Sequence, residues 1–226
     1  MRSEVALVIP VYNEGRVIRD VVNAALRKYS NIICVNDGST DDSLEQLLTT
    51  KAYIVDHPIN MGQGAAIQTG VEFGRLMKDV KYFVTYDADG QHRLEDVDHM
   101  LKTLKNNDVD IVFGSRFTGA TEDMPVAKKL LLKAAVMFSN ITSGLKLTDT
   151  HNGLRAFNRR VADELQITLP DMSHASEILE IVARKKYKYT EVPVTIRYTD
   201  YSRSKGQSMI NAVNIALDTI LRKVAR

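Results

Sequence analysis

The chain has few of the residues that define several common classes of protein. Its 226 residues include no tryptophan and a single cysteine, Cys34. One cysteine cannot form an internal disulfide, so a small domain held together by disulfides is excluded. Cys34 lies in the apolar run IICV, where we expect it to be a small core residue of a protein in a reducing compartment.

The chain also has no excess of charge of one sign and no long apolar run. Its 30 basic and 28 acidic residues give a net charge of +2. Nucleic-acid binding usually needs a basic field over the whole domain, so no nucleic-acid partner is expected. No apolar run is long enough to span a bilayer, and the apolar start is too short for a signal peptide. We expect a cytoplasmic protein that is soluble or peripheral at a membrane.

The chain does contain enough apolar sequence for the core of one domain. The hydrophobic fraction is 44%, and short apolar runs that predict buried strands alternate with segments of helical periodicity. The predicted strands are 5–9, 32–35, 53–55, the run that begins at 82, and 111–113, and the predicted helices are 16–29, 66–77 and 94–104. This alternation predicts an α/β domain with a mostly parallel central sheet and helices on both faces.

The second half of the chain is less regular. Residues 117–125 predict a mobile surface loop. Residues 127–142 predict an apolar helix with three lysines, either a core helix with a solvated basic side or a helix at a membrane surface. A helix from 174, a strand over 192–198 and a basic loop over 201–206 follow, and the pattern from 209 predicts an amphipathic helix with a basic end.

Polar residues stand at the carboxyl ends of the predicted strands, where ligands bind in sheets of this kind. Asp87 and Asp89 are two positions apart. Side chains at that spacing on an extended segment point the same way, so both can face one cation, although the same pattern also occurs in solvated turns. The segment NMGQGAA allows close approach of an anion to a helix start, but tight helix packing selects the same glycines. Asp37, Gly62 and Arg116 fall at the same edge of the predicted sheet.

Six segments, read together and in order, resemble the motifs of the inverting nucleotide-sugar glycosyltransferases of family 2. They are VIPVYNE (8–14), VNDGSTDDS (35–43), NMGQGAA (60–66), DADGQH (87–92), GSR (114–116) and DTHNGLRAF (149–157). Within this family the chain is most similar to the dolichol-phosphate mannose synthases and the bacterial polyprenyl-phosphate glycosyltransferases. The resemblance implies the GT-A fold, a nucleotide-diphospho-sugar transferase fold, over residues 1–207, followed by an amphipathic C-terminal helix over 208–226.

The resemblance also implies roles for individual residues. Those expected at the donor nucleotide are Pro10, Tyr12, Asn13, Glu14, Asp37, Gly38, Gly62, Asp87 and Ala88. The residues around a Mg²⁺ or Mn²⁺ ion would be Asp87, Asp89 and Gln91, and the groups expected to act on the reacting phosphates are Asp89, Arg116, Arg203 and Lys205. Arg155 would lie beneath the acceptor side. The late loop reads YTDYSRSKG where the synthases have Arg-x-x-Gly-x-Ser-Lys, which leaves open the separate roles of Arg197, Arg203 and Lys205.

The choice of acceptor depends on which residue could remove a proton. Relatives that glycosylate a hydroxyl use an Asp of a Glu-Asp pair near the segment that reads SHASEI here, and that pair is absent. A phosphate monoester has a second pKa of about 6 and can attack without a base. We therefore expect inverting, metal-dependent transfer of a hexose from UDP- or GDP-hexose to undecaprenyl or dolichyl phosphate.

The expected setting and the alternatives follow from the same reasoning. A polyprenyl-phosphate acceptor places the enzyme at the inner face of the cell membrane. A small integral membrane partner and a homodimer are both open alternatives there. An alternative is elongation of a polysaccharide or glycolipid on a sugar hydroxyl, with Glu177 or His174 as the base. A sugar-phosphate nucleotidyltransferase is more remote, because such enzymes open with a glycine-rich basic signature where this chain has PVYNEG. A non-catalytic membrane module would rest on the amphipathic helices alone.

Overall fold

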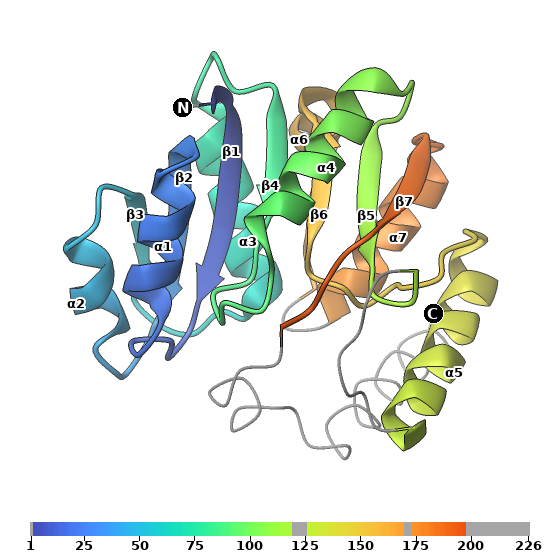
Figure 1. Cartoon of the computed structure of the whole chain (residues 1–226), viewed down its shortest axis with the longest axis horizontal. Helices are drawn as coiled ribbons and strands as arrows, with labels where there is room; N and C mark the ends of the chain where they lie inside the picture. Colours follow the sequence, from blue (N-terminus) through green and yellow to red (C-terminus); the bar gives the residue numbers. More distant parts are fainter. Residues whose placement is uncertain (1, 119–125, 170–172, 198–226) are drawn as a thin grey trace.

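The computed structural model describes residues 2–118, 126–169 and 173–197. Its centre is a seven-stranded sheet in the order β3-β2-β1-β4-β6-β5-β7 (Figure 1). The strands are β1 Arg2–Val11, β2 Tyr29–Asp37, β3 Tyr53–His57, β4 Tyr82–Thr85, β5 Ile111–Ser115, β6 Arg155–Asn158 and β7 Tyr189–Pro193. Every neighbouring pair is parallel except the two pairs that include β6. The predicted mostly parallel sheet is confirmed.

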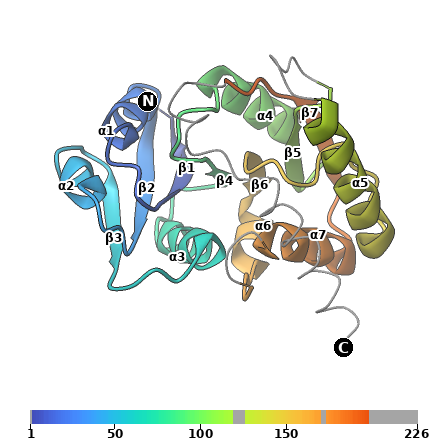
Figure 2. The same cartoon turned by 90° about the horizontal axis from the view of Figure 1, so that it is seen from below.

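Helices cover both faces of the sheet, as the sequence predicted. They are α1 Ile18–Leu26, α2 Ser43–Leu48, α3 Gln63–Arg75, α4 Leu94–Asn106, α5 Val126–Ser143, α6 Arg159–Glu164 and α7 Ser173–Lys185. Figure 2 shows α1 and α4 on one face and α3, α6 and α7 on the other. Alternate residues of β1 join two separate cores, with Val5 and Leu7 packed on the α1 and α4 side and Ala6 and Val8 on the α3 side. A strand that is apolar on both faces is typical of a buried parallel strand.

The structure differs from the predicted strands at two places. The strand expected over 192–198 is wrong, because β7 covers Tyr189–Pro193. Pro193 pairs with Ser115, the last residue of β5, so the β5–β7 register ends there. Beyond it, the amide of Val194 donates to the carbonyl of Ser115 and the amide of Arg197 donates to the carbonyl of Gln91, both at 3.0 Å. The antiparallel strand β6 was not predicted at all.

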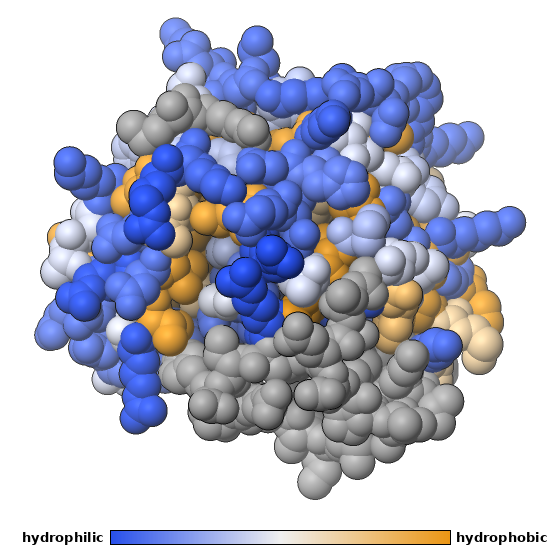
Figure 3. Space-filling model, in the orientation of Figure 1, coloured by the Kyte–Doolittle hydropathy of each residue, from blue (hydrophilic) through white to orange (hydrophobic). Residues whose placement is uncertain are grey.

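The helix predicted over 127–142 is present as α5, at the β7 end of the sheet. Two apolar side chains in its second half are largely exposed, Met137 by 62% and Ile141 by 74%. Figure 3 shows hydrophobic residues over α5 and a mostly hydrophilic surface over α4. Within the described part of the chain, no helix is long and apolar enough to cross a membrane. The basic loop over 201–206 and the helix expected from 209 lie outside the described residues.

Candidate active site

The candidate site residues gather at one edge of the sheet because of the strand directions. β1, β2 and β4 are parallel, so the segments that follow Val11, Asp37 and Thr85 leave from the same edge. β6 runs the opposite way, and its first residue, Arg155, pairs with Thr85 on β4 and with Phe113 on β5. Because β6 is antiparallel, the segment DTHNGLRAF (149–157) that leads into it lies at the carboxyl ends of β4 and β5.

The loop after β1 is clasped to the loop after β2. Asn13 has a positive φ of 55°, and its side-chain oxygen accepts from the amides of Thr40 at 2.8 Å and Asp41 at 3.3 Å. Amides of the first loop donate in turn to side chains of the second: Asn13 to Ser39 Oγ at 3.0 Å, Glu14 to Ser43 Oγ at 2.7 Å and Gly15 to Asp41 Oδ2 at 3.0 Å. The side chain of Asn13 thus shapes the loop beside Tyr12, which is 46% exposed. The nucleotide contacts expected of Pro10, Tyr12, Asn13 and Glu14 stay predictions.

Asp37 is buried and holds the start of α3 in place. Its carboxylate accepts from the amides of Met61 at 2.9 Å and Gly62 at 2.8 Å, and from His57 Nδ1 at 2.8 Å. Gly62 has a φ of 92°, a conformation that favours glycine. A Cβ on Gly38 would lie 2.4 Å from the carbonyl carbon of Ile59, so this turn also needs glycine. These contacts order both loops, and the expected nucleotide contacts of Asp37, Gly38 and Gly62 stay predictions.

Asp87 lies in a tight cradle just beyond β4. Its Oδ2 accepts a hydrogen bond from His92 Nε2 at 2.8 Å, and its Oδ1 accepts from Gln63 Nε2 at 3.3 Å. A Cβ on Gly153 would lie 2.3 Å from Oδ2, so only glycine leaves room for the carboxylate. Burial raises the pKa of Asp87, but the hydrogen bond from His92 and the charge of Arg155 outweigh burial and hold that pKa below its usual range. Asp87 is therefore an oriented, ionised carboxylate.

Asp89 differs from Asp87 although it is only two residues away. Its Oδ1 accepts from the amide of Gln91 at 3.0 Å. Burial, followed by the negative charge of Asp87, raises the pKa of Asp89 to about 6. The strand ends at Thr85, so the two carboxylates lie in the segment after β4, and the extended geometry assumed from their spacing is wrong.

The carboxylate pair fits a hard divalent cation that shares its ligands with a substrate. Over the described ranges, no group of three or more His, Cys, Asp or Glu side chains is arranged to hold a metal by itself. Mg²⁺ commonly takes one or two carboxylates and completes its shell with phosphate oxygens and water. Burial and the nearby negative charge of Asp87 disfavour the ionised form of Asp89, and a bound cation would stabilise that form. The metal roles expected of Asp87, Asp89 and Gln91 are compatible with this arrangement.

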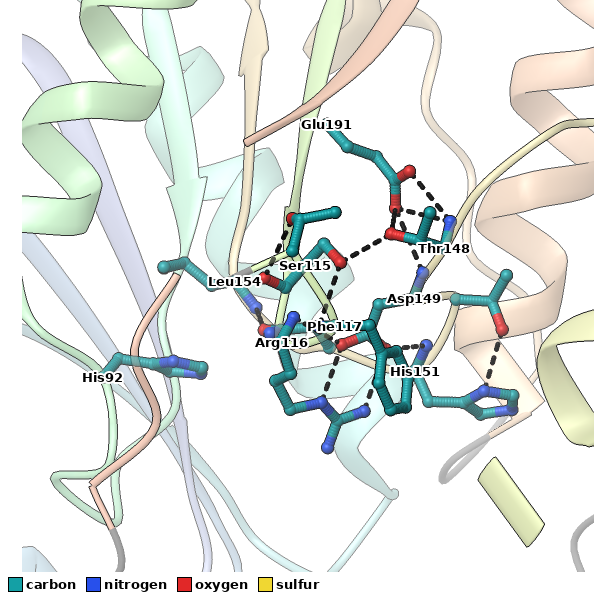
Figure 4. Close-up of polar contacts among 12 residues, drawn as sticks. His92, Ser115, Arg116, Phe117, Thr148, Asp149, His151, Leu154 and Glu191 are labelled. Atoms are coloured by element: carbon teal, nitrogen blue, oxygen red, sulfur yellow. Dashed lines mark hydrogen bonds and ion pairs between the residues drawn. The ribbon is translucent and has the colours of Figure 1, made fainter. Parts of the chain in front are cut away.

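Across the same edge, Arg116 follows β5 and is paired with Asp149. The Nε and Nη2 of Arg116 donate to Asp149 at 2.7 and 2.9 Å, and its backbone amide donates to the same carboxylate at 3.0 Å. Figure 4 shows the pair beside Ser115, Thr148 and Glu191. Burial raises the pKa of Asp149, but the hydrogen bonds and charge of Arg116 outweigh it and hold the pKa below its usual range. The ion pair is therefore fixed at neutral pH.

Arg155 joins the two halves of the site electrostatically. Its side chain is 1% exposed, and burial lowers its pKa to about 10, against the charges of Asp87 and Asp149. Its Nε and Nη1 have no hydrogen-bond partner among the residues that the structure describes. A buried guanidinium in this position stabilises the ionised form of both carboxylates.

Several structurally important residues were not assigned these roles from the sequence. Asp87 is held by Gln63 and His92. The loop after β1 is held by Ser39, Asp41 and Ser43. The segment that leads to Asp149 is anchored by Glu191. The carboxylate of Glu177, a base candidate in the alternative function, accepts instead from the amides of Thr168 and Leu169 at 2.8 to 3.0 Å. His174 is buried, 2% exposed. Arg203 and Lys205 lie outside the described residues.

Two proteins of named activity are similar to this chain over more than nine-tenths of its length. Among curated proteins, the UDP-N-acetylglucosamine–dolichyl-phosphate N-acetylglucosaminyltransferase of Methanococcus voltae is 30% identical over 97% of this chain and 96% of its own. The polyprenol monophosphomannose synthase of Mycolicibacterium smegmatis is 26% identical over 92% of this chain and 82% of its own.

A solved structure with the same fold is glucosyl-3-phosphoglycerate synthase from Mycobacterium tuberculosis in complex with Mg²⁺ and uridine diphosphate. It has a TM-score of 0.72 at 15% identity and covers 96% of this chain and 77% of its own. At that identity the likeness shows the GT-A fold alone. Residues 6–166 match the family model described as Glycosyl transferase family 2. The chain belongs to glycosyl transferase family 2.

Proposed function

We propose that this enzyme transfers a hexose, with inversion, from a nucleotide-diphosphate sugar to the phosphate of a polyprenyl phosphate. One observation carries the proposal: a carboxylate pair and a fixed guanidinium stand at the same sheet edge, with the buried Arg155 interacting with both halves. The two curated relatives support it, since their names state that they act on dolichyl phosphate and make a polyprenol phosphosugar.

The donor half is the part that follows β1, β2 and β4. A bound Mg²⁺ or Mn²⁺ would act as a Lewis acid that neutralises charge on the leaving nucleoside diphosphate. Asp89, with Asp87 and Gln91, would hold that ion, and the clasped loops around Asn13 and Asp37 would hold the nucleotide. The hydrogen bonds of Asp87 to His92 and Gln63 fix its direction before any ligand arrives.

The acceptor half has a guanidinium and no assigned base. Arg116 would bind the acceptor phosphate by charge-assisted hydrogen bonds, which suit a planar guanidinium. An ionised phosphate oxygen attacks the anomeric carbon without giving up a proton, so no general base is required. The hydrogen bonds that occupy Glu177 support this acceptor over a sugar hydroxyl. Arg203 and Lys205 would add positive charge around the phosphates.

The proposal extends to where the enzyme works. A polyprenyl phosphate lies in a bilayer, so residues 1–207 would act as the catalytic domain at the inner membrane surface. The amphipathic segment 208–226 and the exposed Met137 and Ile141 of α5 would meet the bilayer or a small integral membrane partner. The assembly would be peripheral.

A transfer assay tests the proposal. The protein would be incubated with labelled UDP- and GDP-sugars, Mn²⁺, and either undecaprenyl or dolichyl phosphate in detergent. We expect label in the lipid extract for at least one donor, a requirement for Mn²⁺ or Mg²⁺, and loss of product in Asp89→Asn. Label that enters only saccharide or glycolipid acceptors would overturn the proposal and move the function to elongation on a hydroxyl.

A further inference from the structure

Glu191 of β7 anchors the segment that carries Asp149 (Figure 4). It stands opposite Phe113 in the parallel β5–β7 pair. Phe113 lies three residues before Arg116. The amide of Thr148 donates to both carboxylate oxygens of Glu191, at 2.9 and 2.8 Å, and the amide of Asp149 donates to Oε1 at 3.0 Å. The hydroxyl of Thr148 lies 3.1 Å from Oε1 as a further donor. Two consecutive residues are thereby tied to one carboxylate.

The anchored segment holds Arg116 on two sides. Asp149 accepts three hydrogen bonds from Arg116, two from the guanidinium and one from the backbone. Thr148 Oγ1 lies 2.6 Å from Ser115 Oγ, and Ser115 Oγ accepts from the amide of Phe117 at 3.2 Å. The residues on either side of Arg116 are therefore tied to the same segment. The side chain of Asp149 is fully buried, so its direction follows the backbone that Glu191 fixes.

We propose that Glu191 is a positioning residue for Arg116. By fixing the backbone of Thr148 and Asp149, it sets the direction of the Asp149 carboxylate, which in turn sets the plane of the Arg116 guanidinium. This inference rests on the proposed function, in which Arg116 binds the acceptor phosphate. A purely structural anchor would affect stability, whereas a positioning residue affects the use of the acceptor more than the use of the donor.

Asp110 provides a matched control at the other end of the same strands. It precedes β5, and its carboxylate accepts from the amide of Lys188, just before β7, at 2.9 Å and from Asn158 Nδ2 at 3.0 Å. Like Glu191, it is a carboxylate that accepts a hydrogen bond from the backbone amide of a distant segment. It lies at the amino end of β5, away from Arg116. Asp110→Asn therefore removes the same kind of anchor without touching the site.

The first test is steady-state kinetics of the full chain with polyprenyl phosphate and the donor sugar identified by the transfer assay. We expect Glu191→Gln to lower kcat/KM for the acceptor about tenfold and to leave the donor KM within about twofold. Asp110→Asn should leave kcat/KM for the acceptor and KM for the donor within about twofold of the wild type. This should hold even if Asp110→Asn lowers the urea midpoint as much as Glu191→Gln does. In an Arg116→Ala background, Glu191→Gln should add little, because two residues that act through one group are not additive.

The second test needs no activity. The side-chain Nε–H of Arg116 can be followed by NMR in ¹⁵N-arginine-labelled protein and assigned with Arg116→Lys. Its hydrogen bond to Asp149 should slow exchange with water, and we expect Glu191→Gln, but not Asp110→Asn, to speed that exchange about tenfold or more.

The two tests separate the failure of each idea. If Arg116→Ala leaves acceptor kinetics unchanged, the proposed acceptor site is wrong, while the exchange measurement still decides whether Glu191 positions Arg116. If Arg116→Ala impairs the acceptor but Glu191→Gln changes neither acceptor kinetics nor exchange, the positioning role is overturned. Equal effects of Glu191→Gln and Asp110→Asn would also overturn it.

Discussion

Substitution of Asp89 by asparagine should stabilise the metal-free protein at neutral pH. Burial and the charge of Asp87 raise the pKa of Asp89 from 3.8 to about 6. A shift of two pKa units corresponds to about 3 kcal/mol. This is the upper limit to the free-energy cost of ionising Asp89 in the folded protein. Asparagine removes the charge and keeps an oxygen that can accept from the amide of Gln91. The expected gain at pH 7 is about 1–3 kcal/mol.

The sign of the pH dependence makes this prediction specific. The folded protein keeps the Asp89 proton to a higher pH than the unfolded chain does, so this group destabilises the wild type as the pH rises from about 4 to about 6. The advantage of Asp89→Asn should therefore be present at neutral pH and vanish near pH 4. Added Mn²⁺ should reverse the order, because it binds and stabilises the wild type by mass action.

Urea unfolding across this pH range, with and without Mn²⁺, measures both effects. The control is Asp79→Asn, which alters an exposed carboxylate in the turn before β4 and should change neither the pH dependence nor the response to Mn²⁺. A variant Asp89→Asn that is no more stable than the wild type at pH 7 without metal would refute the electrostatic reasoning. So would equal stabilisation of both proteins by Mn²⁺.

Three further substitutions probe the residues around Asp87 and Arg116. Gly153→Ala places a Cβ 2.3 Å from Asp87 Oδ2 and should cost about 1–3 kcal/mol and weaken Mn²⁺ binding, as measured by thermal unfolding with a metal titration. Asp149→Asn leaves Arg116 without its charge partner and should cost about 3–5 kcal/mol at pH 7. Because the folded pKa of Asp149 is lowered, its stabilising charge is present above about pH 4 and lost below it, so unfolding curves of variant and wild type should converge in acid. Arg155→Met removes a charge that lowers the pKa of Asp87, and ¹³C NMR of that carboxyl group should show titration at higher pH; an unchanged titration would contradict the role given to Arg155.

The sequence predicts the parallel part of the sheet well, and the reason is local. β1, β2 and β5 include continuous apolar runs, and such runs are typical of strands buried on both faces. β6 has four residues, Arg155–Asn158, and follows a polar motif. Its place between β4 and β5 depends on contacts with residues more than 40 positions away, which no local pattern indicates.

The candidate site shows the same division between local and distant contacts. Family motifs identify Asp87, Asp89 and Arg116, but their environments depend on distant residues. Asp87 is held by Gln63, 24 residues away, and Arg116 by Asp149, 33 residues away. The loop after β1 likewise depends on hydrogen bonds to the loop after β2, which is more than 25 residues away in the sequence. The different pKa shifts of the two aspartates follow from packing that their spacing does not encode.

The measurement that tests the central claim most directly compares dolichyl phosphate with dolichol of the same chain length. Both would be offered to the enzyme in the same detergent, with the preferred nucleotide sugar and Mn²⁺, and the labelled lipid product would be quantified. The account predicts transfer to dolichyl phosphate alone, because its ionised oxygen attacks without a base while dolichol has a hydroxyl that must lose a proton. Comparable transfer to dolichol, or transfer to dolichyl phosphate that Arg116→Ala leaves unchanged, would contradict the account.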